Sequence, residues 1–266
     1  MKKCILILLV LKSYLLSGQE YFNYIVPSGE LNPNAIQLLI DNDEYIITSI
    51  NFINNRGSSS LFVSGSDFTW SRYDYEGFAL TRNSFGKIND TFYSYGDYNF
   101  GEEMLFFMKY NHNFDISDFT LFNTPSMNNG STSSLFFQDH IYGASVDDYE
   151  GGSHREITLK KIDTLGNEVW SKNYNKDMFL SFAYEIEESR DSNIFIGASF
   201  QYPNIYKRYA QLTKIDTSGN IIWQYRGSDD FDNGAVPTWI AELSNGDIVM
   251  TYYIHGVQTP DIKLIW

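Results

Sequence analysis

The sequence predicts an all-β chain folded as a β-propeller of about four to five blades of roughly 53 residues, in a ring that is either closed or incomplete. The first observation is a ten-residue segment that occurs twice, at residues 161–170 and 214–223, with an offset of 53 residues. The second is a series of short runs rich in Val, Ile, Phe and Tyr, bounded by Gly, Asn, Asp or Ser. The third is that no stretch keeps a 3.6-residue periodicity beyond two turns. Repeats of this period are typical of propellers and solenoids, because one unit cannot bury its apolar faces alone.

The ten-residue segment is predicted to form a β-hairpin. Residues 159–162 form one strand, residues 163–167 the turn, and residues 168–170 begin the next strand. Asp can hydrogen-bond its own backbone, and Gly and Asn accept positive φ, so a change of the turn glycine should strain the turn. One isoleucine and one tryptophan of each copy should pack between neighbouring blades, namely Ile162 and Trp170 in the first copy and Ile215 and Trp223 in the second.

Each copy continues into an acidic loop, a strand, an Asn/Asp/Gly turn and another strand, so one unit holds about four strands. Weaker copies are predicted upstream at residues 72–77, 109–114 and 43–48. Residues 261–266 match the strand that precedes the ten-residue segment. We therefore expect a fragment whose propeller is truncated at its C-terminus. The alternative is that the last strand completes a blade begun at the N-terminus.

The first residues have the order of a secretory signal. A lysine pair precedes an apolar run at residues 4–11, and small residues suited to cleavage follow at 17–18. We assign residues 1–18 to a signal peptide and residues 19–266 to the propeller domain, and we expect the protein to be secreted or held at the outer cell surface. The apolar run is shorter than the about 20 residues of a spanning helix, so no membrane span is expected after cleavage. The alternative is a buried N-terminal strand.

The composition is acidic. The chain has 33 Asp and Glu against 19 Lys and Arg, a net charge of −14, which becomes −17 without the three lysines of residues 1–18. This charge repels phosphate backbones and anionic lipids, so nucleic acid and acidic membranes are not expected partners. Cys4 is the only cysteine, so the mature chain has no disulfide and no cysteine-bound metal. We expect a monomer held together by its core, which a chain of about 248 residues can bury.

The repeat resembles a known class. The ten-residue pattern Lys-Ile-Asp-x-x-Gly-Asn-x-x-Trp, with Gly-Ser-Asp-Asp at 227–230 and Gly-Asp-Ile-Val at 246–249, is similar to the propeller-like repeats of secreted and cell-surface proteins from type IX-secreting bacteria. Residues 159–250 match this class well, and residues 36–158 match it loosely. The resemblance implies an extracellular propeller and does not assign an activity.

The pattern is also similar, with lower specificity, to the tryptophan-docking blades of quinoprotein dehydrogenases and of the outer-membrane assembly scaffold. Those blades place a glycine four residues before the tryptophan that locks neighbouring blades, as Gly166 and Trp170 are placed here. Sialidase Asp-boxes place the aspartate two residues before the glycine. Asp163 lies three residues before Gly166, which argues against a sialidase.

No pattern assigns a catalytic, cofactor-binding or metal-binding residue. The histidines have no metal-ligand spacing; they are His112, His140, His154 and His255. The sequence has no Gly-x-Ser-x-Gly elbow and no phosphate-binding glycine loop. We therefore expect no cofactor.

Acidic segments and aromatic residues are the remaining candidates. Residues 229–234 place oxygen ligands beside a turn glycine, as Ca²⁺ loops do, and residues 147–152 are a weaker version. Both segments lack a distal bidentate glutamate, and solvated loops between strands are the simpler explanation. Three aromatic residues could stack on sugars or could serve in core and rim packing; they are Tyr202, Tyr206 and Trp239.

A group of glutamates offers glycoside chemistry. Glu185, Glu187 and Glu188 could supply paired carboxylates, because Glu185 and Glu187 alternate onto one face of a strand. Surface acids carried by the repeat explain them equally well.

Three functions are compatible with these residues. The leading prediction is an exported, non-enzymatic propeller that binds an extracellular protein or glycan. The second is a polysaccharide-acting enzyme with carboxylates near the propeller channel, and the third is a spacer within a larger secreted protein. Carboxylates clustered at one channel mouth would favour the enzyme, and scattered carboxylates would favour a binding or scaffold role.

Overall fold

The computed structural model describes residues 34–41, 44–53, 56–64, 70–76, 78–99, 103–122, 130–149, 154–175, 178, 180–202, 208–227, 235–254 and 261–265. Over these ranges the chain consists of β-strands and turns without a helix, so the prediction of an all-β chain is confirmed. The described part therefore holds no helix that could cross a membrane. The predicted signal peptide at residues 1–18 lies outside the described residues.

The strands are grouped in chain order into antiparallel sheets, which we call blades 1 to 5. Blade 1 consists of β1 (Asn34–Asp41), β2 (Glu44–Ile53), β3 (Arg56–Ser64) and β4 (Trp70–Glu76). Blade 2 consists of β5 (Phe78–Ile88), β6 (Thr91–Asn99), β7 (Glu103–Tyr110) and β8 (Ile116–Phe122). Blade 3 consists of β9 (Gly130–Phe137), β10 (His140–Tyr149), β11 (His154–Asp163) and β12 (Glu168–Tyr174). Blade 4 consists of β13 (Leu180–Glu188), β14 (Ile194–Gln201), β15 (Arg208–Ile215) and β16 (Ile221–Arg226), and blade 5 of β17 (Ala235–Glu242), β18 (Ile248–Ile254) and β19 (Asp261–Ile265).

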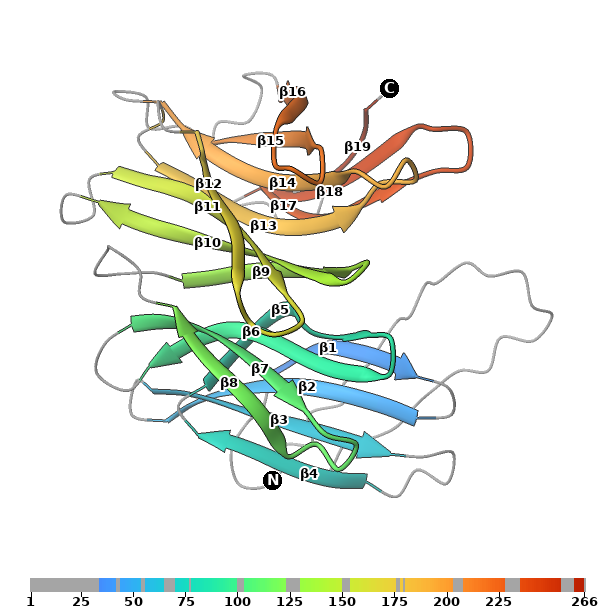
Figure 1. Ribbon diagram of the computed structural model, residues 1–266. Helices are drawn as coiled ribbons and strands as arrows, with labels where there is room; N and C mark the ends of the chain where they lie inside the picture. Colours follow the sequence, from blue (N-terminus) through green and yellow to red (C-terminus); the bar gives the residue numbers. More distant parts are fainter. Residues whose placement is uncertain are drawn as a thin grey trace, which may run out of the picture.

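The first strands of successive blades lie side by side and form the inside of the molecule. They contact one another in the order β1, β5, β9, β13 and β17. Figure 1 shows the blades from the side, from blade 1 in blue to blade 5 in red, with the outer strands β8 and β12 in front. Among the described strands, none of blade 5 pairs with one of blade 1. The structure therefore shows five successive groups of strands, whereas ring closure and the number of blades stay predictions.

The two ends of the blades differ. Because neighbouring strands are antiparallel, the first-to-second and third-to-fourth connections lie on one side, which we call the turn face. The second-to-third connections and the links between blades lie on the opposite side, the loop face. β10, whose last three residues begin the acidic segment at 147–152, and β16 both end at the loop face.

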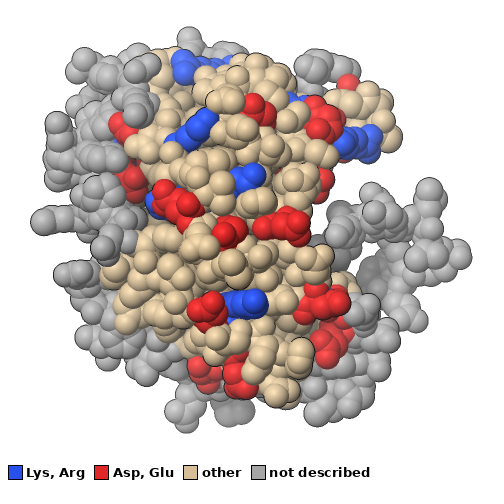
Figure 2. All heavy atoms as spheres, in the orientation of Figure 1, with Lys and Arg blue, Asp and Glu red and all other residues tan. Residues whose placement is uncertain are grey.

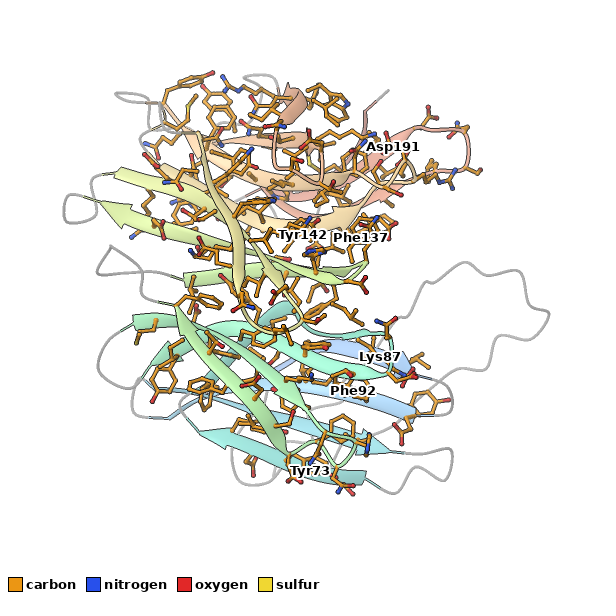
Figure 3. The ribbon with its side chains drawn as sticks, in the orientation of Figure 1. Tyr73, Lys87, Phe92, Phe137, Tyr142 and Asp191 are labelled. Atoms are coloured by element: carbon orange, nitrogen blue, oxygen red, sulfur yellow. The ribbon has the colours of Figure 1, made fainter. Side chains whose placement is uncertain are left out.

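The hydrophobic core is divided into layers between neighbouring blades. Ile162 is buried against residues of blade 2, and Trp170 packs into a cluster shared with blade 4. Phe137 and Tyr142 belong to the same cluster as Trp170 and lie together in Figure 3. In the second copy, Ile215 lies in the layer between blades 3 and 4, and Trp223 in the layer between blades 4 and 5. The predicted packing of both residue pairs is therefore confirmed.

The turn between the third and fourth strands docks on the preceding blade. In the β15–β16 turn, the carbonyl of Gly219 accepts a hydrogen bond from the Tyr174 hydroxyl at 2.8 Å. The carbonyl of Thr217 accepts one from Trp170 Nε1 at 3.3 Å. Both donors are on β12 of blade 3, so the turn closes the layer between blades 3 and 4 with polar contacts as well as apolar ones.

Residues 111–115 form an eroded copy of this turn, as predicted for residues 109–114. Asn111 Oδ1 accepts the backbone N–H groups two and four residues later, at 2.9 and 3.0 Å. Asp163 Oδ1 accepts the equivalent groups at 2.9 and 2.8 Å. Phe114 occupies the place of Gly166 and has a φ of 60°. The backbone geometry is therefore kept although the glycine and the aspartate have been replaced.

Two other predicted repeat segments are in the expected places. Glu44 begins β2 directly after the first-to-second turn of blade 1, as Ile194 begins β14 in blade 4. Residues 261–265 form β19, which pairs with β18 as β15 pairs with β14.

The copy predicted at residues 72–77 is wrong. Arg72 pairs with Phe62 in the middle of the β3–β4 ladder, so residues 72–76 belong to the fourth strand of blade 1 and not to its turn. The pattern misled because Asp74 and Gly77 have the same spacing as Asp163 and Gly166.

Gly219 supports a prediction about stability. A Cβ at this position would lie 2.8 Å from the Lys172 side chain and 3.0 Å from the Trp170 ring, and φ is 79°. We expect Gly219→Ala to lower the free energy of unfolding by about 2–4 kcal/mol, from left-handed strain plus overpacking. Urea denaturation followed by tryptophan fluorescence measures this loss. The matched control is Gly246→Ala, where φ is 91° and no atom lies within 4 Å, so only the strain of about 1 kcal/mol remains. Equal losses in both variants would contradict the docking contact.

The turn aspartates predict an acid dependence of stability. The backbone N–H of Asn220 lowers the pKa of Asp216 below its ordinary value of 3.8. Burial raises the pKa of Asp163, but hydrogen bonds from Asn167 and Leu165 outweigh it, so this pKa is also lowered. Because the folded pKa lies below the unfolded one, the stabilisation is complete above about pH 4 and is lost as the pH falls further.

We expect Asp216→Asn to flatten the fall in unfolding free energy between pH 5 and pH 2, by no more than about 1 kcal/mol because this carboxylate is exposed. Urea titrations at a series of pH values measure the slope. A variant slope equal to the wild-type slope would show that Asp216 does not contribute.

Candidate functional site

The inner strands share one irregularity around the axis of the blades. The pairing register skips Ile36 in β1, Thr132 in β9, Tyr184 in β13 and Thr238 in β17, and it is broken across residues 81–84 in β5. In four of these strands the skipped residue lies four or five positions before the turn-face end, and the longer irregularity of β5 spans the same level. A bulge releases backbone groups from the ladder and redirects side chains. The blades therefore carry bulges at a common level beside the axis.

A polar cluster, which we call the axis cluster, occupies this level. Asn83 Nδ2 donates to Glu185 Oε1 at 2.9 Å, although Asn83 is in blade 2 and Glu185 in blade 4. Ser134 of blade 3 donates its hydroxyl to the carbonyl of Asn83 at 2.8 Å. Asn83 has a φ of 54°, which the irregularity of β5 allows. The inner strands β5, β9 and β13 are thus joined by side chains that meet at the axis.

Glu185 is held in the interior. Its side chain is 2% exposed, and burial of a carboxylate is tolerated only when the group has hydrogen-bond partners. The amide of Asn83 supplies one such partner and fixes the direction of Oε1. Glu187 is partly buried and Glu188 is exposed, so the three predicted glutamates stand in three different environments.

The bulge in β13 sets which side chains share the face with Glu185. Ala183 and Ile186 both pack in the layer between blades 3 and 4, although they are three residues apart. Tyr184 and Glu185 between them therefore both face the other way, and Glu187 follows them by ordinary alternation. Phe182 stacks on Tyr184 with ring centroids 6.1 Å apart and an interplanar angle of 28°. One strand thus presents an aromatic pair near the loop face and carboxylates deeper along the axis.

The predicted sugar-stacking residues have separate positions. Trp239 is 47% exposed and follows the bulge of β17, so an aromatic ring is available beside the axis. Tyr202 is packed against Phe200 and Tyr209 and accepts a hydrogen bond from Arg226 at 3.2 Å, which makes it a packing residue. Tyr206 lies outside the described residues.

The other candidates do not converge. His112 is exposed in the β7–β8 turn, and His140 begins β10, where burial and the charge of Lys161 lower its pKa. His154 begins β11, and His255 lies outside the described residues. Within the described ranges, no three His, Cys, Asp or Glu residues are grouped to hold a metal ion.

Of the two acidic segments, only residues 147–149 are among the described residues. Residues 229–234 lie outside the described residues. Of residues 147–152, Asp147 is buried and accepts a hydrogen bond from Thr158 at 2.5 Å. On the side of the molecule seen in Figure 2, Asp and Glu are spread over the blades and do not form one patch.

Sequence reasoning missed Asn83 and Ser134. Asn83 is 102 residues from Glu185, and neither residue belongs to the ten-residue repeat. The local signal was the polar run at residues 81–84, which lies between the apolar Leu80 and Phe85 of β5.

No family model matches this chain, and no curated protein matches it. Solved structures with a β-propeller fold are similar to it. The endo-arabinase of Bacteroides thetaiotaomicron aligns over 89% of this chain and 94% of its own, with a TM-score of 0.50 and 11% identity. The subtype N10 neuraminidase-like protein of A/little yellow-shouldered bat/Guatemala aligns over 85% and 76%, with a TM-score of 0.56 and 8% identity. The sucrose-6-phosphate hydrolase of Lactobacillus gasseri aligns over 84% and 53%, with a TM-score of 0.50 and 11% identity. At these identities the similarity shows the fold.

The axis cluster predicts a measurable coupling. Asn83→Gly removes the donor to Glu185 while relieving the positive φ, so any loss reflects the side chain. We expect a loss of about 1–3 kcal/mol in unfolding free energy, because a buried carboxylate loses a hydrogen bond. The control is Asn89→Gly, in an exposed turn with a φ of 53°, which should be neutral or slightly stabilising. If both variants behave alike in urea denaturation, the axis cluster does not stabilise the fold.

Proposed function

We propose that the protein is an exported propeller that hydrolyses polysaccharide, with Glu185 and Glu187 as its pair of catalytic carboxylates. The observation that carries this proposal is the bulge in β13, which puts Tyr184, Glu185 and Glu187 on one side of an inner strand. Inverting glycoside hydrolysis needs two carboxyl groups about 6.5–9.5 Å apart, with room for a water between them. Residues two apart on one face of a strand have Cα atoms about 6.6 Å apart, a backbone spacing from which two glutamate side chains can reach such a separation.

The environments of the two carboxylates suit different roles. Glu185 accepts a hydrogen bond from Asn83, and an amide donor stabilises the ionised form of a carboxylate. We assign it as the base that takes a proton from the attacking water. Glu187 is partly buried, and we assign it as the acid that gives its proton to the departing glycosidic oxygen. Phe182 and Tyr184 would support a sugar ring beside them.

The similarity in fold supports this direction. The endo-arabinase and the sucrose-6-phosphate hydrolase are named as enzymes that act on carbohydrate, and both share the chain's architecture at a TM-score of 0.50. Their low identity means that the proposal rests on the residues of β13.

A non-enzymatic binding propeller is the second candidate. Glu185 is almost fully buried and already accepts a hydrogen bond, which suits a structural carboxylate that joins blades 2 and 4. Trp239 and the Phe182–Tyr184 pair would then bind an extracellular glycan or protein without turnover. The predicted signal at residues 1–18 and the resemblance to secreted repeat proteins support an extracellular location for either function.

The test is the release of reducing ends from a panel of arabinan, galactan, mannan, fructan and uronan. We expect Glu185→Gln and Glu187→Gln each to lower kcat/KM by about 10²–10⁴-fold, because each removes one proton-transfer group. Glu188→Gln is the matched control, since Glu188 is exposed on the same strand and should keep wild-type activity. Thermal melting checks that each variant is folded.

Each other outcome selects a function. Binding of one polysaccharide without release of reducing ends would support the binding propeller and reject the hydrolase. Wild-type activity in Glu185→Gln would remove Glu185 from catalysis.

A further inference from the structure

Two arginines from different blades converge on one ring at the loop face. The guanidinium carbon of Arg155 lies 5.2 Å from the centroid of Phe182, and that of Arg208 lies 5.0 Å from the same centroid. Arg155 follows the first residue of β11 in blade 3, and Arg208 begins β15 in blade 4. Both side chains are partly exposed, so their polar edges can reach solvent.

This arrangement brings like charges together. The chain as a whole has a net charge of −14, so a paired positive spot is opposite to its general character. The ring of Phe182 attracts both cations through its negative face, which offsets part of their mutual repulsion. The anionic group of a ligand would add to this attraction, since each guanidinium presents a planar fork of N–H donors that matches the two oxygens of a carboxylate or sulfate.

The cross-strand neighbours make the two arginines unequal. Arg208 lies opposite the neutral Gln201, whereas Arg155 lies opposite Asp148 in the β10–β11 register. Glu156, next to Arg155, accepts a hydrogen bond from Asn173 at 2.9 Å. The backbone register therefore gives Arg155 an acidic cross-strand residue and Arg208 a neutral one, and we expect Arg208 to contribute more to anion binding.

The spot is continuous with the proposed site. Phe182, which the two arginines flank, is stacked on Tyr184, and Tyr184 immediately precedes Glu185 on the same side of β13. Three residues of strand correspond to about 10 Å, a distance that a short oligosaccharide spans. A third arginine, Arg226, lies 5.1 Å from the Phe200 centroid at the same end of blade 4.

We propose that Arg155 and Arg208 form an anion subsite, and that the ligand of this protein is an acidic polysaccharide. A sugar ring lies beside the Phe182–Tyr184 pair, and its carboxylate or sulfate group accepts hydrogen bonds from the two guanidinium groups. The inference deepens the proposed function, on which it rests, by naming the substrate class. Uronic acids and sulfated sugars present the same kind of planar oxygen pair, and the experiment separates them.

The overall charge shapes how such a ligand binds. A negative protein repels a polyanion at long range, but charges are screened beyond about 8 Å at physiological ionic strength. Affinity must therefore come from short-range contacts with the arginines, and electrostatic steering will not accelerate association.

The experiment is calorimetric titration with three oligosaccharides of equal length, one of uronate units, one sulfated and one neutral. Titrations use the Glu185→Gln protein so that no ligand is consumed. We expect one anionic oligosaccharide to bind at least tenfold more tightly than the neutral one, and the better of the two identifies the charged group. Arg208→Gln and Arg155→Gln should each weaken its Kd, with about a tenfold loss for Arg208→Gln, while the Kd of the neutral ligand stays unchanged.

Two further variants keep the result interpretable. Arg190→Gln removes one positive charge from the exposed turn after β13, at the opposite end of the strand, and should leave every Kd unchanged. Arg208→Lys keeps the charge over Phe182 but lacks the fork, and should give an intermediate loss. Melting temperatures of all variants verify folding.

The outcomes separate the subsite from the catalytic proposal. Equal affinity for neutral and anionic ligands, or an unchanged Kd in Arg208→Gln and Arg155→Gln, overturns the anion subsite even if Glu185-dependent hydrolysis of a neutral polysaccharide is found. Arginine-dependent binding of an anionic ligand without hydrolysis keeps the subsite and rejects the hydrolase.

Discussion

The burial of each blade's faces against its neighbours is the constraint on which the structure depends. A four-stranded sheet has two faces, and most of its large side chains are covered only when another sheet lies on each side. Ile162 and Trp170 of one hairpin serve opposite layers, one toward blade 2 and the other toward blade 4. A blade is therefore not an independent unit of stability, and a change in one hairpin is felt in both neighbours.

The hydrogen bonds between blades fix how neighbouring blades align, which apolar packing alone does not. Trp170 and Tyr174 donate to the backbone of the next blade's turn, so the turn must present its carbonyls at one position and one orientation. Apolar layers alone tolerate sliding, whereas hydrogen bonds of this kind favour a single alignment. The alignment of the blades then determines where the inner strands meet, and thus whether Asn83 can reach Glu185.

Much of the architecture was predictable because it depends on residues that are close together in the sequence. The hairpin turn, the aspartate that caps it and the packing of its Ile and Trp between blades depend on residues within ten positions of one another, and these predictions hold. The copy at residues 72–77 failed because an aspartate that fits the turn pattern, Asp74, lies inside strand β4. The axis cluster was not predictable, because its hydrogen bond joins residues 102 positions apart and depends on bulges that leave no periodic mark. Glu185 was a candidate from the alternation of strand residues alone. The bulge at Tyr184 then placed the Tyr184 side chain on the same side of β13 as Glu185, which alternation does not predict.

The eroded turn at residues 111–115 has a consequence for how such chains diverge. Asn111 and Phe114 stand where the better-kept copies have Asp and Gly, yet the capping bonds and the left-handed backbone persist. The backbone shape of this turn is therefore compatible with more than one set of side chains. Repeats of this kind can therefore lose detectable sequence similarity to one another while the backbone geometry of their turns stays the same. Blades of one chain can then share a fold without recognisable similarity in sequence.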